Sequence, residues 1–331
     1  MADDAALPKV SIIVASYNNE QTIEECLRSI LALDYPEGYV ELIVMDGESK
    51  DATVKKAQQF PVKVVSIRLN CPAAYNYAMK NVTSHEVLGF IDSDAKVEPQ
   101  WLRKLVPRLN EPQVVGVSGS IETWNPENPW ARSIGYEIKS RYSRIGKYTG
   151  RIATMNLLLK KAVIEEAGGW DENLPSQYDT DLGFRVSAKG YKIAYEPTAV
   201  CYHYNRPTLK AYYRQQREYG KNTLKLYFKH SGLARGDEIT DLGMNIQPIL
   251  LLASIIFFLV GIIPAVRLFW VGSGLILAFM LLYFVYSAAD TAAKFHDSSA
   301  FRLIVLYYVR AAAWFVGATA TTLRYLNRRH R

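Results

Sequence analysis

The sequence has few cysteines and no cysteine framework. Of its 331 residues only Cys26, Cys71 and Cys201 are cysteines, and their spacing matches no metal-ligand motif. A small secreted domain held together by disulfides would have more. We therefore expect these three residues to be unpaired members of a hydrophobic core. The length is sufficient for one large domain or two smaller ones.

The N-terminal region lacks the pattern of a secretory signal peptide. Residues 1–8 contain two aspartates and no basic residue, and the first apolar run covers only residues 10–15. We therefore expect the N-terminal domain to stay in the cytoplasm. The net charge of +7 agrees with an anionic membrane or ligand as partner, and we expect no nucleic-acid partner.

Two long segments lack formal charge altogether. Residues 242–266 form an uncharged run of 25 residues, and residues 268–289 form another of 22. A membrane-spanning helix needs about 20 apolar residues. The pattern therefore predicts two spans. The alternative is a pair of buried helices in a soluble protein, which rarely stay uncharged over such lengths.

A third apolar segment, residues 303–323, is interrupted by Arg310 near its middle. An arginine at mid-bilayer costs at least about 2.5–3.5 kcal/mol on insertion scales. This segment either spans with Arg310 facing protein or water, or lies in the membrane interface. The basic tail favours a cytoplasmic C-terminus, whereas three spans would place it outside; its residues are Arg324, Arg328, Arg329 and Arg331.

The N-terminal half alternates strand-like and helix-like segments. Residues 9–15, 40–46, 62–67 and 86–94 are short, apolar runs rich in β-branched residues, which is typical of buried strands. Helices are expected between them, the first preceded by Thr22 and Glu25 at capping-box spacing. Alternating strands and helices predict an α/β fold with a mostly parallel, Rossmann-like sheet and flanking helices.

Polar residues follow three of these strands: residues 16–18, Asp46, and residues 92–94. In open parallel sheets, ligands bind beyond the carboxyl ends of the strands. The three groups are therefore expected to meet in one crevice. No glycine occurs in residues 15–20, so a glycine-rich triphosphate cradle, as a nucleotidyltransferase would need, is absent.

Asp92 and Asp94 flank a serine at a strand end, so both carboxylates can face one hard cation. Oxygen ligands suit Mg²⁺ or Mn²⁺, and such a cation would neutralise a departing nucleoside diphosphate. The alternative is a solvated acidic turn. His203 is either a further metal or phosphate contact or a structural histidine.

Two further acidic positions have open interpretations. Asp46 can accept hydrogen bonds from a base or ribose, or can cap the next helix. Asp179 and Asp181 precede a helix-like run. One of them can take a proton from an acceptor hydroxyl, while the other caps that helix.

Over about residues 8–230 the chain resembles glycosyltransferase family 2, the inverting enzymes with a GT-A fold. The motifs that carry the resemblance are VSIIVASYNNEQTIEECLRSI, IVMDGESKDAT, FIDSDA, NLLLKKAVIEEAGGWDE and YDTDLGFRVSAKGY. The first four, in this order, are specific when found together.

The resemblance implies a role for each matching residue. Tyr17 and Asp46 would bind the base or its ribose. Asp92 and Asp94 would hold the diphosphate and the metal. Asp179 would be the general base, and His203 a diphosphate or metal contact.

The chain departs from the family pattern at three places. Ala15 stands where proline is frequent, and Tyr178 where glutamate often precedes the base. The Q-x-x-R-W motif of processive, cellulose-synthase-like members is degraded to RQQREY at residues 214–219. This weakens a processive interpretation, although Arg217 is kept as a candidate diphosphate contact.

We expect three regions: a GT-A catalytic domain over residues 1–205, an amphipathic interfacial helix region over 206–245, and a transmembrane domain over 246–331. Lysines and arginines recur at helical spacing from Lys210 to Lys229, so this helix would present a basic face to a membrane surface. The layout resembles polyprenyl-phosphate sugar synthases and reduced cellulose-synthase-like enzymes.

The expected activity is inverting transfer of a hexose from a nucleotide-sugar donor, with mannose from GDP-mannose as the first choice. The acceptor would be lipid-linked, of the polyprenyl-phosphate type. The expected location is the plasma membrane, multi-pass, with the catalytic domain in the cytoplasm, and a homodimer is left open. The alternatives are a UDP-sugar-dependent polysaccharide synthase and a membrane-anchored, non-enzymatic nucleotide-sugar binding subunit.

Overall fold

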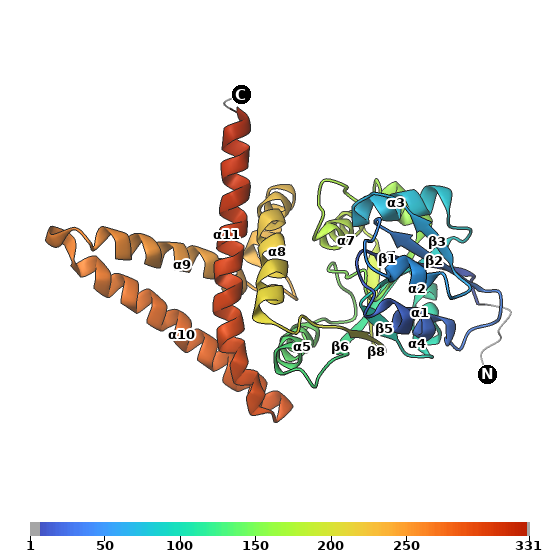
Figure 1. Cartoon of the computed structure of the whole chain (residues 1–331), viewed down its shortest axis with the longest axis horizontal. Coiled ribbons are helices and arrows are strands. Elements are labelled where there is room, and N and C mark those ends of the chain that lie inside the picture. The colour runs from blue at the N-terminus through green and yellow to red at the C-terminus, as the bar shows by residue number, and fades with distance from the viewer. Residues whose placement is uncertain (1–6, 330–331) are drawn as a thin grey trace. The chain divides into compact units, whose positions relative to one another are not determined.

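The computed structural model describes residues 7–329, with side chains up to Thr322. The aspartates at the N-terminus and the side chains of the arginine-rich tail therefore lie outside the described part. The chain divides into two compact units (Figure 1). The first contains the chain up to Trp124 together with Arg144–Tyr204, and the second contains Asn125–Ser143 and the chain from Asn205 onward.

The first unit is built on an eight-stranded sheet with the order β3-β2-β1-β4-β7-β6-β8-β5. Its strands are β1 (Val10–Ser16), β2 (Val40–Asp46), β3 (Lys63–Ser66), β4 (Val87–Asp92), β5 (Ala95–Val97), β6 (Val114–Thr123), β7 (Leu157–Lys160) and β8 (Lys192–His203). β1, β2, β3 and β4 pair in parallel, as the sequence predicts. β7 pairs antiparallel with β4 and β6, whereas β6 and β8 are parallel.

Helices cover both faces of this sheet. They are α1 (Ile23–Leu31), α2 (Thr53–Ala57), α3 (Cys71–Asn81), α4 (Trp101–Leu105), α6 (Lys161–Glu166) and α7 (Tyr178–Ala188), with the 3₁₀ helix η2 (Val106–Asn110) after α4. The capping box expected at the start of α1 is wrong, because Thr22 makes no side-chain cap hydrogen bond there. Its hydroxyl points back to the carbonyl of Asn19 instead.

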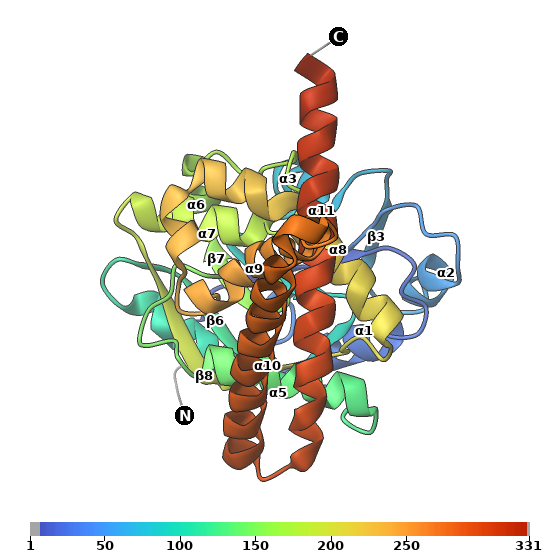
Figure 2. The same ribbon diagram turned by 90° about the vertical axis from the view of Figure 1, so that its left-hand side faces the viewer.

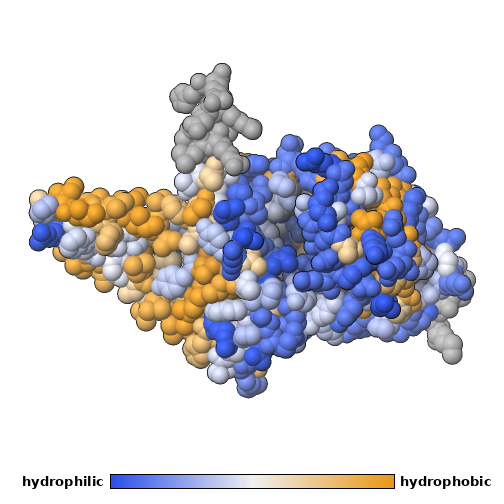
Figure 3. Space-filling view, viewed as in Figure 1, coloured by the Kyte–Doolittle hydropathy of each residue, from blue (hydrophilic) through white to orange (hydrophobic). Residues whose placement is uncertain are grey.

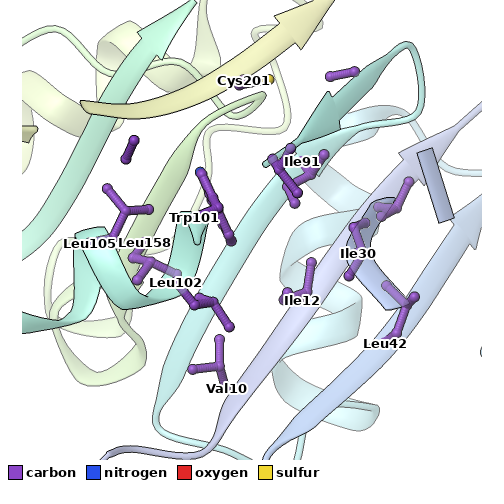
Figure 4. Close-up of a cluster of buried hydrophobic side chains, with 14 of the residues drawn as sticks. Val10, Ile12, Ile30, Leu42, Ile91, Trp101, Leu102, Leu105, Leu158 and Cys201 are labelled. Carbon is purple, nitrogen blue, oxygen red and sulfur yellow. The ribbon is translucent and has the colours of Figure 1, made fainter. Parts of the chain in front are cut away.

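Two apolar clusters hold the helices on the sheet. Alternate residues of β1 point to opposite faces, as the period of a strand requires: Ile12 belongs to the cluster under α1 and α4, and Ile13 to the cluster under α3 and α7. Figure 4 shows the first cluster, with Trp101 lying across the strands. Cys26, Cys71 and Cys201 are free cysteines, which confirms their expected unpaired state.

The second unit is helical. Its helices are α5 (Pro129–Tyr142), α8 (Leu209–Lys229), α9 (Leu242–Val260), α10 (Leu268–Phe295) and α11 (Leu303–Arg329), with the 3₁₀ helices η3 (Ser231–Arg235), η4 (Pro264–Val266) and η5 (Ser298–Arg302). Three segments of the described chain are long and apolar enough to cross a membrane: 242–260, 268–295 and 298–322. Figures 1 and 2 show that α9 and α10 form a hairpin and that α11 runs past its open end.

The surface of the hairpin is apolar. Large side chains along both helices are exposed, among them Leu275 at 66% and Leu282 at 69%. Figure 3 shows apolar residues spread over this part of the second unit. Two hydroxyls, of Ser254 and Ser273, are buried between the helices and hydrogen bond at 3.0 Å. This bond satisfies both polar groups without exposing them to lipid.

Arg310 is buried among other side chains of the second unit. The residue is 3% exposed, and its guanidinium donates to Glu137 of α5 and to Gln247 of α9, the latter at 3.1 Å. Its charged group also lies 4.7 Å from the centre of the Tyr307 ring. Breaking such a buried pair by removing one partner costs about 3–5 kcal/mol, so this arginine ties three helices together.

α8 packs closely against α11, and glycine makes this approach feasible. A Cβ atom on Gly220 would lie 2.6 Å from the Trp314 backbone, and one on Gly317 would lie 2.3 Å from the carbonyl oxygen of Arg217. Trp314 also donates from Nε1 to Gln216 at 2.9 Å. Gly220 therefore does not divide the helix, because the packing it allows offsets its low helix propensity of about 1 kcal/mol relative to alanine.

Candidate active site

Strand register brings the expected polar residues to one edge of the sheet. β1 lies between β2 and β4, with Ser16 opposite Asp46 and Ala15 opposite Asp92. The carboxyl ends of these three parallel strands therefore coincide. Two acidic residues from different loops flank the end of β1, as the fold rule for ligand crevices predicts.

Asp46 is buried and holds its own loop together. Its carboxylate accepts hydrogen bonds from the backbone amide and hydroxyl of Ser49, and from the hydroxyl of Ser66 at 2.8 Å. A carboxylate has about four lone-pair positions. Three are used by these serines, which leaves room for one further donor such as a ribose hydroxyl or a base.

Tyr17 stands at the opening of this edge. Its side chain is 59% exposed, and a Cβ atom on Gly47 would lie 3.3 Å from its ring. Glycine thus lets the ring lie close to the backbone after β2. Hydrogen bonds join the segment after β1 to the segment after β2: the amide of Asn18 donates to Ser49 at 2.8 Å, and the amide of Lys50 donates to Asn18 at 2.8 Å. These hydrogen bonds therefore fix the loop that contains Tyr17.

Asp92 ends β4 in a desolvated position. Burial, together with the neighbouring Asp94 carboxylate, raises the pKa of its carboxyl group to about 7. His203 and a hydrogen bond from Thr154 at 3.1 Å oppose the shift. A buried carboxyl group whose pKa is raised by a neighbouring carboxylate marks a site where a cation is electrostatically favoured.

Asp94 and His203 are brought together by the short strand β5. Ala95 pairs with His203 across the antiparallel β5–β8 ladder, and the amide of Tyr204 donates to the Asp94 carbonyl at 2.8 Å. The Oδ1 atom of Asp94 lies 3.6 Å from Nε2 of His203. Both side chains are buried, at 9% and 5% exposure.

These residues fit a divalent cation in part. Two carboxylates and one imidazole form a donor set that suits Mn²⁺ or Mg²⁺. Within the described residues, however, no three acidic, histidine or cysteine side chains are placed to hold a metal by themselves. The Oγ atom of Ser16, buried at the end of β1, also has no hydrogen-bond partner among the described residues. A ligand with phosphate or hydroxyl oxygens would complement both features.

The two acidic residues of α7 have different surroundings. Asp181 is fully buried and accepts from Nε of Arg185 at 2.8 Å, and the same guanidinium donates to the carbonyls of Ala167 and Gly169. Asp179 accepts from the amide of Thr180 at 2.7 Å, and burial raises its pKa. Its charge also raises the pKa of Asp92. Asp181 therefore stabilises the fold through Arg185, whereas a catalytic role for Asp179 stays a prediction.

Arg217 belongs to α8 in the second unit. Its guanidinium lies 3.7 Å from Glu218 of the same helix. The residues of the first unit come together without it, so a diphosphate contact by Arg217 stays a prediction.

Sequence reasoning missed the residues that support the acidic groups. Thr154 lies in an irregular segment before β7, and Ser66 ends the short strand β3. Neither residue lies in a sequence motif that indicates a catalytic or binding role. The contact of Ser49 with Asp46 could have been predicted, because a serine three residues after an aspartate is typical of a turn.

A comparison with family models matches residues 8–220 to the family described as Glycosyltransferase like family 2. Among curated proteins, Glycosyltransferase AglE of Haloferax volcanii is 27% identical over 61% of this chain and 69% of its own. Poly-beta-1,6-N-acetyl-D-glucosamine synthase of Staphylococcus epidermidis is 24% identical over 62% of this chain. The matched region spans only 52% of that synthase.

A solved structure, Mannosyltransferase PcManGT from Pyrobaculum calidifontis in complex with GDP-Man and Mn²⁺, has a similar fold. It superposes with a TM-score of 0.60, at 20% identity, over 97% of this chain and 88% of that one. The expected α/β fold of the GT-A type, followed by C-terminal helices, is confirmed. Because the family model matches residues 8–220, more than half of this chain, the chain belongs to Glycosyltransferase like family 2.

Proposed function

We propose that this glycosyltransferase transfers a hexose, in the first instance mannose from GDP-mannose, to a lipid-linked acceptor with inversion at the anomeric carbon. The observation that carries the proposal is the edge of the sheet where Asp46, Asp92 and Asp94 meet, with Nε2 of His203 3.6 Å from Asp94. This arrangement offers one position for a nucleoside and one for a charged diphosphate.

The nucleoside is assigned to the β1–β2 side. The exposed ring of Tyr17 can stack on a base, and stacking on aromatic rings contributes about 1–3 kcal/mol per base. The remaining acceptor capacity of Asp46 suits a ribose hydroxyl or a base amine. The unpartnered Oγ of Ser16 supports a polar ligand at the same strand ends.

The diphosphate is assigned to the β4 side, with a divalent cation held by Asp92, Asp94 and His203. When bound, such a cation neutralises charge that develops on a leaving diphosphate. The carboxylates alone would repel the donor, since the charge of Asp94 already raises the pKa of Asp92. The GDP-Man and Mn²⁺ in the structure of PcManGT agree with this assignment and motivate the choice of mannose.

Asp179 is proposed to accept the proton of an acceptor hydroxyl. The competing carboxylate, Asp181, is held by Arg185 at 2.8 Å and is not placed for proton transfer. An acceptor whose nucleophile is a phosphate oxygen is already ionised at neutral pH and needs no base. The effect of Asp179 on the rate therefore distinguishes a lipid-linked hydroxyl from a bare polyprenyl phosphate.

The apolar hairpin α9–α10 motivates the lipid-linked acceptor and a location in the plasma membrane. A soluble acceptor would give these exposed apolar helices no evident purpose. The first unit is proposed to lie in the cytoplasm, where nucleotide sugars would reach it.

The test is a donor panel with the full-length protein in detergent or vesicles. GDP-mannose, UDP-glucose and UDP-N-acetylglucosamine are supplied with Mn²⁺, and nucleotide release is measured without lipid, with polyprenyl phosphate, and with a polyprenyl-linked sugar whose nucleophile is a hydroxyl. We expect release from GDP-mannose that increases with the lipid. Release only from a UDP-sugar would replace the donor and favour a polysaccharide synthase. Tight donor binding without any release would favour the non-enzymatic binding subunit.

A further inference from the structure

Beside the hairpin helices, α11 packs against α8 and α5, and the charges of these two helices conflict with a position inside the hydrocarbon. α8 lies along the second half of α11, with Gly220 at Trp314 and the hydroxyl of Thr321 donating to the Lys221 carbonyl at 3.0 Å. α8 itself carries charges at several exposed positions: Lys210, Arg214, Glu218, Lys225 and Lys229. Each would cost at least about 2.5–3.5 kcal/mol at the level of the lipid tails.

The first half of α11 has a charged neighbour as well. α5 contributes Glu137, whose carboxylate accepts from Arg310. The same helix carries Lys139 exposed, and Arg132 lies 3.7 Å from Asp297 just before α11 begins. Charged helices therefore accompany α11 along both halves of its length.

The remaining surface of α11 is a mostly apolar stripe, in which Thr319 is an exposed polar residue. Val305 and Val316 are exposed, at 43% and 40%, and lie on one side of the helix because eleven residues make three helical turns. Val309 and Ala312 fall on the same side between them, whereas Leu306, Arg310 and Ala313 are buried. One apolar side and otherwise covered sides are typical of a helix that lies in a membrane surface.

The hairpin, in contrast, has the dimensions of two spans. α9 has 19 residues, about 28 Å at 1.5 Å per residue, which matches the hydrocarbon thickness of about 30 Å. α10 is uncharged from Leu268 to Ala289 and acquires charge only at Asp290 and Lys294, near its end. The turn between the two helices ends in the exposed Arg267. Polar groups therefore mark both ends of the hairpin.

We infer that only α9 and α10 cross the membrane, and that α11 lies along the lipid surface with its Val305–Val316 stripe toward the acyl chains. α5 and α8 then cover α11 on its aqueous side. The beginning of α8 and the end of α11 then lie on the same side of the membrane. This agrees with a basic tail on the cytoplasmic side, which three spans would not allow. The inference does not depend on the transfer reaction.

Spin labels measure this directly in the full-length protein in phospholipid vesicles. Single cysteines are introduced as Val305→Cys and Val316→Cys with Cys71→Ser as background, since Cys26 and Cys201 are buried. Depth is determined from collisions with oxygen and with a water-soluble nickel complex. Eleven residues correspond to about 16 Å along a helix axis. We expect the two labels at nearly equal depth below the headgroups.

The matched control pair lies on α10. Leu275→Cys and Leu282→Cys are seven residues apart, about 10 Å along the axis, and both positions are exposed. These labels should differ clearly in depth. A depth difference of more than about 10 Å between Val305 and Val316, where a span would give about 16 Å, would overturn the inference.

A second measurement tests the side of the membrane. Lys210→Cys, Ala265→Cys and Thr322→Cys are all exposed positions, and a membrane-impermeant maleimide is added to sealed vesicles of one orientation. We expect Lys210 and Thr322 to react from one side and Ala265 from the other. Reaction of Thr322 together with Ala265 would show that α11 crosses the bilayer.

Discussion

Oδ1 of Asp94 lies 3.6 Å from Nε2 of His203, although the two residues come from strands far apart in the sequence. β5 causes this proximity, because it pairs antiparallel with the end of β8 and places Ala95 opposite His203. The acidic pair after β4 thus acquires an imidazole neighbour through backbone pairing.

The first prediction concerns this pair. Asp94→Asn should lower kcat/KM by more than about 100-fold and weaken Mn²⁺-dependent nucleotide binding, because the cation that counters the charge on the leaving diphosphate loses a ligand. His203→Gln should have a smaller effect of the same kind. Binding and turnover are measured across a Mn²⁺ titration, with the exposed Glu37→Gln as control. Unchanged Mn²⁺ dependence in Asp94→Asn would exclude the assigned ligand.

A second prediction separates the carboxylates of α7. Asp179→Asn should retain donor binding and lose transfer to a hydroxyl acceptor by about 10²-fold or more, the usual scale for loss of a general base. Asp181→Asn should mainly destabilise the protein, by about 1–3 kcal/mol, because Arg185 loses a buried acceptor. Thermal unfolding and single-turnover transfer are compared. An active Asp179→Asn beside a folded but inactive Asp181→Asn would reverse the assignment.

Third, the pH dependence should report the burial of Asp179. Burial raises its pKa above that of an ordinary aspartate, about 3.9. A base must be deprotonated, so activity should rise with pH through this raised pKa and be lost as the pH falls below it. The acid limb of the kcat/KM profile should therefore lie at higher pH than an ordinary aspartate would give. It should disappear from the residual activity of Asp179→Asn; if that variant keeps the same limb, another group titrates.

The fourth prediction addresses Arg310. Arg310→Met leaves the carboxylate of Glu137 buried and unpaired, so we expect a loss of about 3–5 kcal/mol. The double variant Arg310→Met with Glu137→Leu removes both charges and should recover most of that loss. Thermal unfolding in detergent measures each variant. Additive losses in the double variant would show that the two side chains do not depend on each other.

Fifth, the glycine contact between α8 and α11 should be sensitive to one methyl group. Gly317→Ala brings a Cβ to 2.3 Å from the Arg217 carbonyl and should destabilise the protein by about 1–3 kcal/mol through overpacking. Gly274→Ala, on α10, is the matched control, because a Cβ there has no atom within 4 Å. It should be neutral or slightly stabilising. Equal unfolding temperatures for both variants would argue against the close crossing.

The parallel half of the sheet was predictable because its signals are local. Residues 10–16, 40–46 and 87–92 are continuous apolar runs that end in polar residues, and the parallel rule then places Asp46 and Asp92 together. The antiparallel half was not, because β7 has only four residues and β5 only three. β7 pairs with the edge of β4 that β1 does not occupy, and β5 pairs with the end of β8. These pairings depend on tertiary contacts and not on the local sequence.

The acidic residues of the site were predictable, because their residue type indicates their chemistry. The residues that hydrogen bond to them were less predictable, because those contacts join distant parts of the sequence. Asp179 was chosen over Asp181 by resemblance, whereas the structure gives a physical reason in Arg185. Thr154 reaches Asp92 across 62 residues, and no local pattern indicates that. Similarly, Arg310 raised the question of a third span, and its partner Glu137 lies in a helix that the sequence alone does not assign to the second unit.

The pairing of Glu137 with Arg310 also sets an order of events on the ribosome. The two residues are 173 positions apart, so at about 5–20 residues per second, roughly 10–35 s pass between their synthesis. During this time α5 is already made, but the arginine that its carboxylate needs is not. The strands of the first unit are all available once Tyr204 has emerged. The nascent chain can therefore close its sheet while α5, encoded between β6 and β7, remains unpaired until the later helix α11 has been translated.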